Sequence, residues 1–570
     1  MSVFRNGHTT QYLTEQFVGS TMGKQYLIVG GNAAGMSTAT RLRRLDETAE
    51  ISVFESTANV SYASCGLPYH LSDTVPESEL AVMGVDQLSA AFDLDIRTET
   101  TVTDIAPGAQ RVTVEPDDGD ASQLAYDELV LATGAEPLVP PMFDVEAIDG
   151  CHTLRTVEDA IGVRAQVDDA ERALVIGGGY IGIEVAENLH EAGHEVVVAE
   201  LLDQVMPNTL GAEMAALVEQ HVDSQGVDLR LGTGVSELSE TDNGTIIATM
   251  DDETQEFDLV VIATGVRPRT ELAEAAGLEC HDSGAIAVDS RLRTSEPSIH
   301  AVGDAVAVPS VFGEQAWIPL GGPANRQGRV AANDIAGHDD ELAPVLDTAI
   351  AKVFDLDVGT VGQTAATLDE AGYEYEAVYT SEPNHAKYYP GASDIHFKLL
   401  FDPADGTVFG AQAIGEAGVD KRIDVLATAI SHGDTVFDIR DLDLAYAPPY
   451  SAAKDPVNVL GMIGTNVVEG VADIIHLDEF RKIRDEATVV DTRPPEMRET
   501  QGSIPGDEHV PLGDLRSWAA DHDPDGEVVT YCKIGKSSYM ATRVLDHEGI
   551  EARSLTGGYY RYRAADVDAE

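Results

Sequence analysis

The chain has 570 residues, 43% of them hydrophobic, so it is long enough to form about three or four domains with separate cores. Its 36 lysines and arginines face 99 aspartates and glutamates, and the formal net charge of −63 excludes nucleic acid and anionic membranes as electrostatic partners. The acidic residues are interleaved with Val, Ile, Leu and Ala, which is typical of a charged surface over folded cores. Because lysine is also absent between Lys24 and Lys352, the composition favours a halophilic protein in a salt-rich cytoplasm.

The sequence contains no run of about 18 apolar residues, and no apolar signal core lies in its opening residues. We therefore expect a cytoplasmic protein without a membrane span, with a loose tail over residues 1–22 that carries no function. The four cysteines, Cys65, Cys151, Cys280 and Cys532, are widely spaced and include no Cys-x-x-Cys pair. This spacing excludes a disulfide scaffold and a cysteine-rich zinc site, and we expect no metal.

The first strong pattern is a βαβ unit with a glycine-containing turn. A buried strand is predicted over residues 26–29, followed by the turn Gly-Gly-Asn-Ala-Ala-Gly at 30–35 and an Ala-rich helix through Arg44. A second strand, residues 51–54, ends at Glu55. Asn32 occupies the second glycine position of the dinucleotide-binding turn.

The same unit returns later with a complete glycine pattern. The strand at 173–176 leads into Gly-Gly-Gly-Tyr-Ile-Gly at 177–182, a helix to about Ala192 and a strand over 196–199 that ends at Glu200. In such turns the glycines permit a tight turn, close approach of pyrophosphate and helix packing, and the acid accepts from a ribose 2′-hydroxyl. Since an acid would repel a 2′-phosphate, the second site favours NAD(H) over NADP(H). The pair of sites implies a flavoprotein with separate FAD and NAD(H) domains.

Three further segments are expected to close strands at the cofactor crevices. Two apolar strands, residues 129–134 and 259–265, each end in Ala-Thr-Gly, and a third segment ends in Gly303-Asp304. Short strands with one helix, residues 423–432, are predicted over 348–464. Residues 461–470 are predicted to be a linker to a last α/β domain of about 100 residues.

With these motifs, residues 24–465 resemble the pyridine nucleotide-disulfide oxidoreductases. The resemblance implies an α/β fold with two Rossmann-like dinucleotide-binding domains and an α+β dimerisation domain, and hence a homodimer. The domain limits that we expect are 23–145 with 270–340 for FAD, 146–269 for NAD(H) and 341–465 for dimerisation. The expected cofactor contacts are Gly30, Gly31, Asn32, Ala33, Ala34, Gly35, Glu55, Thr133, Gly134, Gly303 and Asp304 for FAD, and Gly177, Gly179, Tyr180, Ile181, Gly182, Glu200 and Gly265 for NAD(H).

One cysteine stands in the position of the family's redox centre, within Ser-Tyr-Ala-Ser-Cys-Gly-Leu-Pro-Tyr at residues 61–69. Members of the glutathione reductase type carry two cysteines five positions apart here, whereas this chain has Val60 and His70 on either side of Cys65. Without an internal disulfide, Cys65 must cycle through a mixed disulfide with a small thiol, a persulfide or a sulfenic acid. The segment is similar to that of the coenzyme A-disulfide reductases, the single-cysteine branch.

The same resemblance implies further site residues. Tyr388 and Tyr446 are expected to come from the partner subunit and approach the reactive sulfur, where a phenol could hydrogen-bond a leaving thiolate. The helix after the first turn offers cations, Arg41, Arg43 and Arg44, for the phosphates of CoA. The positions that match CoA contacts are Ser37, Arg41, Arg44, Ser61, Ser64, Asn325 and Lys454.

The last domain, residues 472–570, resembles rhodanese. Strands are predicted at 489–490 and 528–531, and a helix from about Ser538. The loop Cys532-Lys-Ile-Gly-Lys-Ser-Ser precedes this helix, so its amides could converge on the sulfur and lower the pKa of the thiol. Such a thiolate can take up sulfane sulfur as a persulfide. Cys151 and Cys280 are expected to be buried, inert thiols.

The leading hypothesis is an enzyme that passes hydride from NADH to FAD and then reduces a mixed disulfide or persulfide on Cys65, while Cys532 supplies or accepts sulfur. CoA disulfide, CoA persulfide, polysulfide or a similar low-molecular-weight thiol are the candidate substrates. An alternative is an NADH oxidase or peroxidase that uses Cys65 sulfenic acid. A non-enzymatic alternative is a sulfur carrier or redox sensor with a rhodanese docking module, against which the two dinucleotide sites argue.

Overall fold

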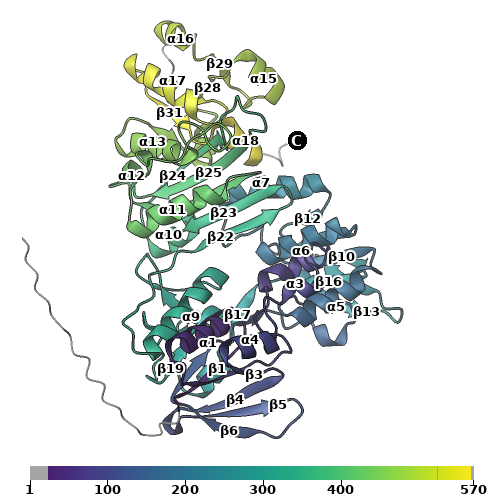
Figure 1. Ribbon diagram of the computed structural model, residues 1–570. Helices are drawn as coiled ribbons and strands as arrows, with labels where there is room; N and C mark the ends of the chain where they lie inside the picture. The colour runs from purple at the N-terminus through teal and green to yellow at the C-terminus, as the bar shows by residue number, and fades with distance from the viewer. Residues whose placement is uncertain (1–22, 523, 525, 566–570) are drawn as a thin grey trace, which may run out of the picture.

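The chain is described by a computed structural model that covers residues 23–522, 524 and 526–565. The tail predicted over residues 1–22 lies outside this range. Figure 1 shows the first dinucleotide unit at the bottom in purple and teal, the second in blue at the right, an antiparallel sheet with its helices in green above them, and the last α/β unit in green and yellow at the top.

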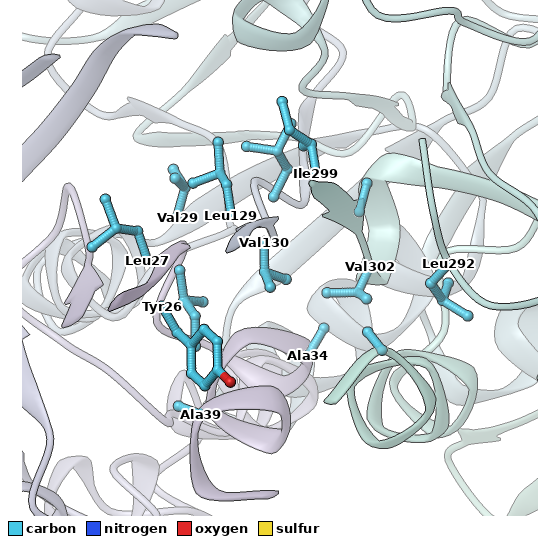
Figure 2. Close-up of a cluster of buried hydrophobic side chains, with 14 of the residues drawn as sticks. Tyr26, Leu27, Val29, Ala34, Ala39, Leu129, Val130, Leu292, Ile299 and Val302 are labelled. Carbon is cyan, nitrogen blue, oxygen red and sulfur yellow. The ribbon is translucent and has the colours of Figure 1, made fainter. Parts of the chain in front are cut away.

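The first sheet is parallel and is completed by a strand from far along the chain. Its strand order is β19 (Ile299–Ala301), β7 (Glu128–Leu131), β1 (Gln25–Val29), β2 (Glu50–Phe54) and β3 (Asp95–Arg97). Helices α1 (Ala33–Leu45) and α9 (Gly321–Ile335) pack against each other beside it. Figure 2 shows the core between these layers, which includes Tyr26 of β1, Val130 of β7 and Val302 directly after β19. Strands covered on both faces read as continuous apolar runs, which is why the sequence predicted them.

The second sheet repeats the design of the first. Its order is β12 (Asp228–Arg230), β11 (Glu195–Ala199), β10 (Arg172–Ile176), β16 (Leu259–Ile262) and β9 (Cys151–His152), all parallel. The accompanying helices are α5 (Val157–Val167), α6 (Tyr180–Glu191) and α7 (Ala212–Gln225). Strands β8 (Ala135–Pro137) and β17 (Val266–Pro268) pair antiparallel and join the two dinucleotide units.

Smaller elements decorate these two sheets. Three antiparallel or mixed sheets are formed by β4 (Thr100–Ala106), β5 (Arg111–Pro116) and β6 (Ser122–Ala125), by β13 (Val235–Glu240), β14 (Ile246–Met250) and β15 (Glu253–Phe257), and by β18 (Ile286–Ala287), β20 (Val306–Pro309) and β21 (Gln315–Trp317). The short helices are α2 (Leu67–His70), α3 (Glu77–Leu80), α4 (Val85–Phe92) and α8 (Glu271–Ala275).

The third unit is a five-stranded antiparallel sheet with more helices than the sequence predicted. The strand order is β22 (Thr348–Val353), β23 (Leu356–Gly362), β26 (Val408–Gly415), β25 (Asp394–Phe401) and β24 (Glu376–Pro383). The predicted helix is present as α11 (Asp420–His432). The prediction of a single helix was wrong, because α10 (Ala365–Ala371), α12 (Val436–Arg440) and α13 (Pro456–Val468) are also present.

The predicted linker at 461–470 is wrong as well, because most of it lies in α13. Asp455 caps this helix by accepting from the Val457 N–H, and Pro456 follows at its first position. Gly461 lies so close to α12 that a Cβ there would come within 2.4 Å of the Arg440 nitrogen. The glycines that suggested a linker therefore allow two helices to approach closely.

The last unit is a parallel sheet surrounded by helices. Its strand order is β27 (Ile474–Ile475), β31 (Ala552–Leu555), β30 (Val528–Tyr531), β28 (Thr488–Asp491) and β29 (Glu508–His509). The helices are α14 (Leu477–Ile483), α15 (Pro495–Gln501), α16 (Leu515–Asp521), α17 (Lys536–His547) and α18 (Gly558–Ala565). Helix α18 contacts α7 of the second dinucleotide unit, and Figure 1 shows the two beside the antiparallel sheet.

Within the described part of the chain, none of the helices combines the length and the apolar character needed to cross a membrane. The same residues contain no group of three or more His, Cys, Asp or Glu side chains arranged to hold a metal ion.

Candidate active site

The two glycine turns have matching geometry. Gly30 and Gly177 have φ angles of 106° and 112°, and a Cβ at either would come within 2.4 Å of a carbonyl oxygen of a neighbouring strand end. The acids that close the second strands accept from the turns, since the Gly31 N–H donates to Glu55 Oε2 at 2.8 Å and the Gly178 N–H donates to Glu200 Oε2 at 2.6 Å. The predicted acids thus lie against their turns.

Both following helices begin without a capping side chain. Neither α1 nor α6 has a side-chain cap or an acid in its first turn. A Cβ at Gly179 would meet nothing within 4 Å, so the start of α6 is open. Asn32, at the equivalent place in the first turn, has an extended backbone that a non-glycine residue can adopt. Because a helix N-terminus attracts anions, both turns fit a dinucleotide pyrophosphate.

The remaining predicted cofactor residues lie around these turns. A Cβ on Gly303 would come within 2.9 Å of the Ala34 side chain, and the Asp304 carboxylate is paired with Arg155 at 3.0 Å. The Ala-Thr-Gly ends meet where β8 and β17 pair: the Leu138 N–H donates to the Gly265 oxygen and Thr133 donates to the Arg269 oxygen. The structure therefore brings both strand ends to one crossing between the dinucleotide units.

Cys65 lies in a 3-10 helix, Ser64–Gly66, directly before α2, and it is exposed. The segment is attached to the first glycine turn, because the Ser61 N–H donates to the Gly31 oxygen at 2.9 Å. All four cysteines are free thiols. The segment that carries Cys65 is thus attached to the first glycine turn, and Cys65 has no other cysteine as its partner.

A carboxyl group that the sequence did not predict is linked to the Cys65 segment through Tyr69. The Tyr69 hydroxyl, one helical turn after the cysteine, donates to Glu184 Oε1 at 3.3 Å. Burial raises the pKa of the Glu184 carboxyl to about 7. The hydrogen bond from Tyr69 lowers this pKa, whereas the negative charge of Glu187 raises it. Burial, together with Glu184, also raises the pKa of Tyr69. The only signal for this pair in the sequence was Tyr69, the last residue of the cysteine motif.

The two predicted tyrosines lie together on the third unit. The hydroxyls of Tyr388 and Tyr446 are 3.1 Å apart, and this hydrogen bond raises the pKa of Tyr388. Their exposed fractions are 75% and 49%. Among the described residues neither hydroxyl bonds to Cys65 of its own chain. The pair is therefore available to a second molecule.

The predicted CoA contacts fall into two groups. Ser37 and Asn325 lie together, with the Ser37 hydroxyl donating to Asn325 Oδ1 at 2.6 Å, and Arg41 donates to Asn333 Oδ1 at 2.8 Å. These contacts join α1 to α9. Arg44 is exposed and lies over the Phe92 ring. The other group, Ser61, Ser64 and Lys454, makes no contact with the α1–α9 pair that the structure records among its described residues.

Two arginines differ from what the sequence predicted. Arg43, which the sequence offered as a phosphate ligand, is 4% exposed and donates to backbone oxygens, including those of Phe92 and Ala49. Arg329 was missed: it is exposed, lies one turn after Asn325 on α9, and has no hydrogen bond or ion pair within the described chain. In a chain this acidic, an unpaired arginine on that face is a candidate phosphate ligand.

The second candidate thiol lies at the carboxyl end of β30. Cys532 is 3% exposed, and its sulfur accepts from the Gly535 N–H at 3.2 Å and from the Ser538 hydroxyl at 3.6 Å. The Tyr559 N–H, at the start of α18, donates to the Cys532 carbonyl at 2.7 Å. The loop thus places hydrogen-bond donors at the sulfur, as predicted, and α18 holds the loop through the Cys532 carbonyl.

The other two cysteines differ from each other. Cys151 is buried, and burial raises the pKa of its thiol to about 11, which fits the expected inert role. Cys280 is exposed, so the expectation of a buried thiol was wrong for it. It lies on the surface after the short helix α8, and the pattern of its neighbours in the sequence did not predict this exposure.

Comparisons with protein families match nearly the whole described chain. Residues 24–328 match the family "Pyridine nucleotide-disulphide oxidoreductase", residues 348–456 match its dimerisation domain, and residues 476–565 match the rhodanese-like domain.

Individual proteins resemble most or nearly all of the chain. A Methanocaldococcus jannaschii protein named NADH oxidase is 33% identical and covers 76% of this chain and 97% of its own length. The crystal structure of reduced Bacillus anthracis CoADR-RHD is 38% identical, with a TM-score of 0.93, and covers 96% of this chain and 99% of that one. An NAD-dependent persulfide reductase from A. fulgidus is 38% identical, with a TM-score of 0.88, and covers 94% of this chain and 100% of that one.

Proposed function

Because the chain belongs to the pyridine nucleotide-disulphide oxidoreductase family, we propose that it uses NADH to reduce CoA disulfide, CoA persulfide or polysulfide at a single cysteine, Cys65. It is an oxidoreductase that uses FAD and a nicotinamide cofactor, and it carries a rhodanese-like domain. One observation carries the proposal: Cys65 is exposed, has no cysteine partner and is hydrogen-bonded through its segment to a nucleotide turn.

The chemistry that we assign to Cys65 is thiol–disulfide exchange. Its thiolate attacks one sulfur of CoA disulfide, an S–S bond forms between Cys65 and one CoA, and the other CoA leaves as a thiolate. Two electrons from NADH then cleave the mixed disulfide, which releases the second CoA thiol and restores Cys65. With CoA persulfide as substrate, the leaving group is hydrosulfide instead.

Proton transfer to the leaving thiolate falls to phenols. We assign it to Tyr388 and Tyr446 of the partner subunit, as the resemblance implies, and their exposure and mutual hydrogen bond support this role. In a homodimer this pair would be covered by the other subunit. Glu184, protonated below about pH 7, can hold a proton beside Tyr69 on the same chain.

Recognition of CoA is assigned to the face shared by α1 and α9. Ser37, Arg41, Arg44 and Asn325 lie on it, and Arg329 adds an unpaired cation. Guanidinium groups bind phosphate oxygens in pairs, so this face suits the phosphates of CoA in a chain that otherwise repels anions. Ser61, Ser64 and Lys454 are assigned to the thiol end of the ligand.

The two glycine turns are assigned to the two cofactors. We propose that the sheet built on β1 holds FAD and the sheet built on β10 holds NAD(H), with the domain limits that the sequence predicts. When bound, FAD relays electron pairs between the nicotinamide and the sulfur. The chain's own contribution is positional: Glu55 and Glu200 accept from ribose hydroxyls, and the uncapped starts of α1 and α6 bind pyrophosphate.

Cys532 is assigned to sulfane sulfur. The donors around its sulfur stabilise a thiolate or a persulfide anion, and Lys533 and Lys536 add positive charge to the loop. The resemblance of the whole chain to a persulfide reductase supports this assignment.

The test is NADH consumption with CoA disulfide, CoA persulfide, polysulfide and oxygen as separate acceptors, in about molar salt because of the net charge. The proposal expects one or more of the CoA or polysulfide acceptors to exceed oxygen, and Cys65→Ser to abolish their reduction while FAD stays bound. Oxygen as the best acceptor would instead support the NADH oxidase function by which one relative is named. If NADH is consumed with none of these acceptors, the remaining candidate is a sulfur-carrier or redox-sensing role.

A further inference from the structure

Three units of the chain meet around a small cavity that the proposed reaction does not use. The cavity lies between α7, strands β24 and β25, and α18, and has a volume of about 30 Å³. Its polar lining includes Glu213, Tyr379, Ser381, His396, Tyr560 and Arg561. Cys532 is not part of the lining, so this is a site separate from both thiols.

The ionic cluster of Glu213, Lys398 and Arg561, of which Glu213 and Arg561 line the cavity, carries an excess of positive charge. Burial alone would raise the pKa of Glu213, but Lys398 and Arg561 hold it at about 2, so the carboxylate is ionised. Lys398 Nζ is 2.6 Å from Glu213 Oε1 and Arg561 Nη2 is 3.9 Å from it. Burial lowers the pKa of His396, which is therefore neutral. Two cations share one anion, which leaves one positive charge without a counter-ion in this cluster.

Arg561 also has hydrogen-bond donors that nothing satisfies. Its guanidinium carbon lies 3.8 Å from the centre of the Tyr379 ring, and its side chain is 13% exposed. The Nε and Nη1 atoms are buried and have no acceptor among the described residues. Buried donors almost always have a partner, so this guanidinium calls for an acceptor that the polypeptide does not supply.

We propose that the cavity binds one small monovalent anion, which in a salt-rich cell is chloride. One unbalanced positive charge matches a monovalent anion, and a volume of about 30 Å³ suits an ion about the size of one or two water molecules. Water alone would satisfy the donors of Arg561 but would leave the buried charge without a counter-ion, which is costly. A chloride ion satisfies the donors and the charge together.

The anion would hold the last unit in place. Helix α18 carries Arg561 and at its start donates the Tyr559 and Tyr560 N–H groups to the carbonyls of Cys532 and Lys533. At its other end, Gln220 of α7 donates to the Ala564 carbonyl. Binding to the docked arrangement alone shifts the equilibrium toward it in proportion to the anion concentration above the dissociation constant. The Cys532 loop is thus supported through α18 in a chloride-dependent way.

The direct test is a crystal structure of the full chain grown in potassium bromide. The proposal expects anomalous bromide density within hydrogen-bond distance of Arg561 Nε or Nη1. Density without an anomalous signal at that position would mean water, and it would overturn the proposal.

A solution test measures alkylation of Cys532 by iodoacetamide, followed by mass spectrometry, in potassium chloride and in potassium glutamate, whose organic anion is much larger than chloride. Raising chloride from about 0.2 M to about 2 M should slow alkylation up to about tenfold more than the same rise in glutamate does. Arg561→Gln removes the excess positive charge and should abolish the difference between the two salts. Glu213→Gln increases the excess positive charge and should enlarge that difference. Arg563→Gln, an exposed arginine of the same helix, is the control and should behave like the parent. Equal slopes in the two salts for the parent protein would contradict the proposal.

Discussion

Glu184 accepts from the Tyr69 hydroxyl of the cysteine segment, and the fold changes the protonation of its carboxyl group. Burial raises its pKa from an ordinary value of 4.5 to about 7, so the folded protein keeps a proton there that the unfolded chain releases. Stability from this proton is complete below about pH 4.5 and is lost as the pH rises through about 7. The loss amounts to about 3 kcal/mol at most.

The first prediction follows from this window. Glu184→Gln keeps a neutral side chain at all pH values, so its gain in melting temperature over the parent should grow between about pH 5 and pH 8. Glu171→Gln, at an exposed glutamate of the same unit, should show a constant difference. Parallel melting curves for Glu184→Gln and the parent across this range would contradict the buried, protonated carboxyl.

The second prediction concerns Glu200, which is 8% exposed and accepts from two backbone N–H groups. A 2′-phosphate beside this carboxylate is repelled in a partly dry crevice, so kcat/KM should be much higher for NADH than for NADPH. Glu200→Ser should reduce that ratio about tenfold or more, while Glu195→Ser at the far end of β11 leaves it unchanged. A parent enzyme that prefers NADPH would show that another cation overrides the acid.

At this scale the sequence predicted the residues that chain spacing alone positions. Glu55 and Glu200 follow the second strands of the βαβ units. Because each second strand pairs in register with the first, the acid at its end lies beside the glycine turn. Glu184 and Tyr69 could not be paired in advance, because they come from α6 and from the cysteine segment, which meet only in the tertiary structure.

Among the elements, the α1–α9 pair decides how an anionic substrate can approach an acidic protein. Arg329→Ala should raise KM for CoA disulfide about tenfold with little change in kcat, because we assign this arginine to a phosphate of CoA and not to the reacting sulfur. Arg111→Ala, at an exposed position on β5, is the control. A fall in kcat without a change in KM would contradict a binding role.

Elements were predicted wherever apolar periodicity and turn residues agreed. Strands β1, β2, β10 and β11 and helices α1 and α6 matched closely, because parallel strands are uniformly apolar and glycine turns mark helix starts. Helix α13 was missed because its glycines suggested a linker, although their function is close packing on α12. Helices α10 and α12 are short, and only the capping boxes at Thr364 and Thr435 marked them.

For the whole molecule, the arrangement of units separates the two thiols. Cys532→Ser should leave the reduction of CoA disulfide nearly intact, because Cys65 lies on a different unit and needs no contact with Cys532. The same variant should slow sulfide release from a polymeric or protein-bound sulfane donor. Sulfide and NADH are assayed in parallel with both substrates. Equal losses on both would mean that the domain is structural or that the two sites act as one.

The order of the units along the chain followed from motifs, but their mutual contacts did not. Glu213, Lys398 and Arg561 come from three separate units and show no pattern in the sequence. Ion pairs between distant segments depend on how finished sheets and helices dock, and local propensity does not encode that step.

The central claim is that Cys65 forms a mixed disulfide with CoA and is restored by NADH. The most direct measurement is mass spectrometry of the protein after reaction with CoA disulfide, with peptide mapping before and after NADH is added. The account predicts one CoA per subunit, attached to Cys65 and removed by NADH. An adduct on another cysteine, or turnover of CoA disulfide with no adduct on Cys65, would contradict it.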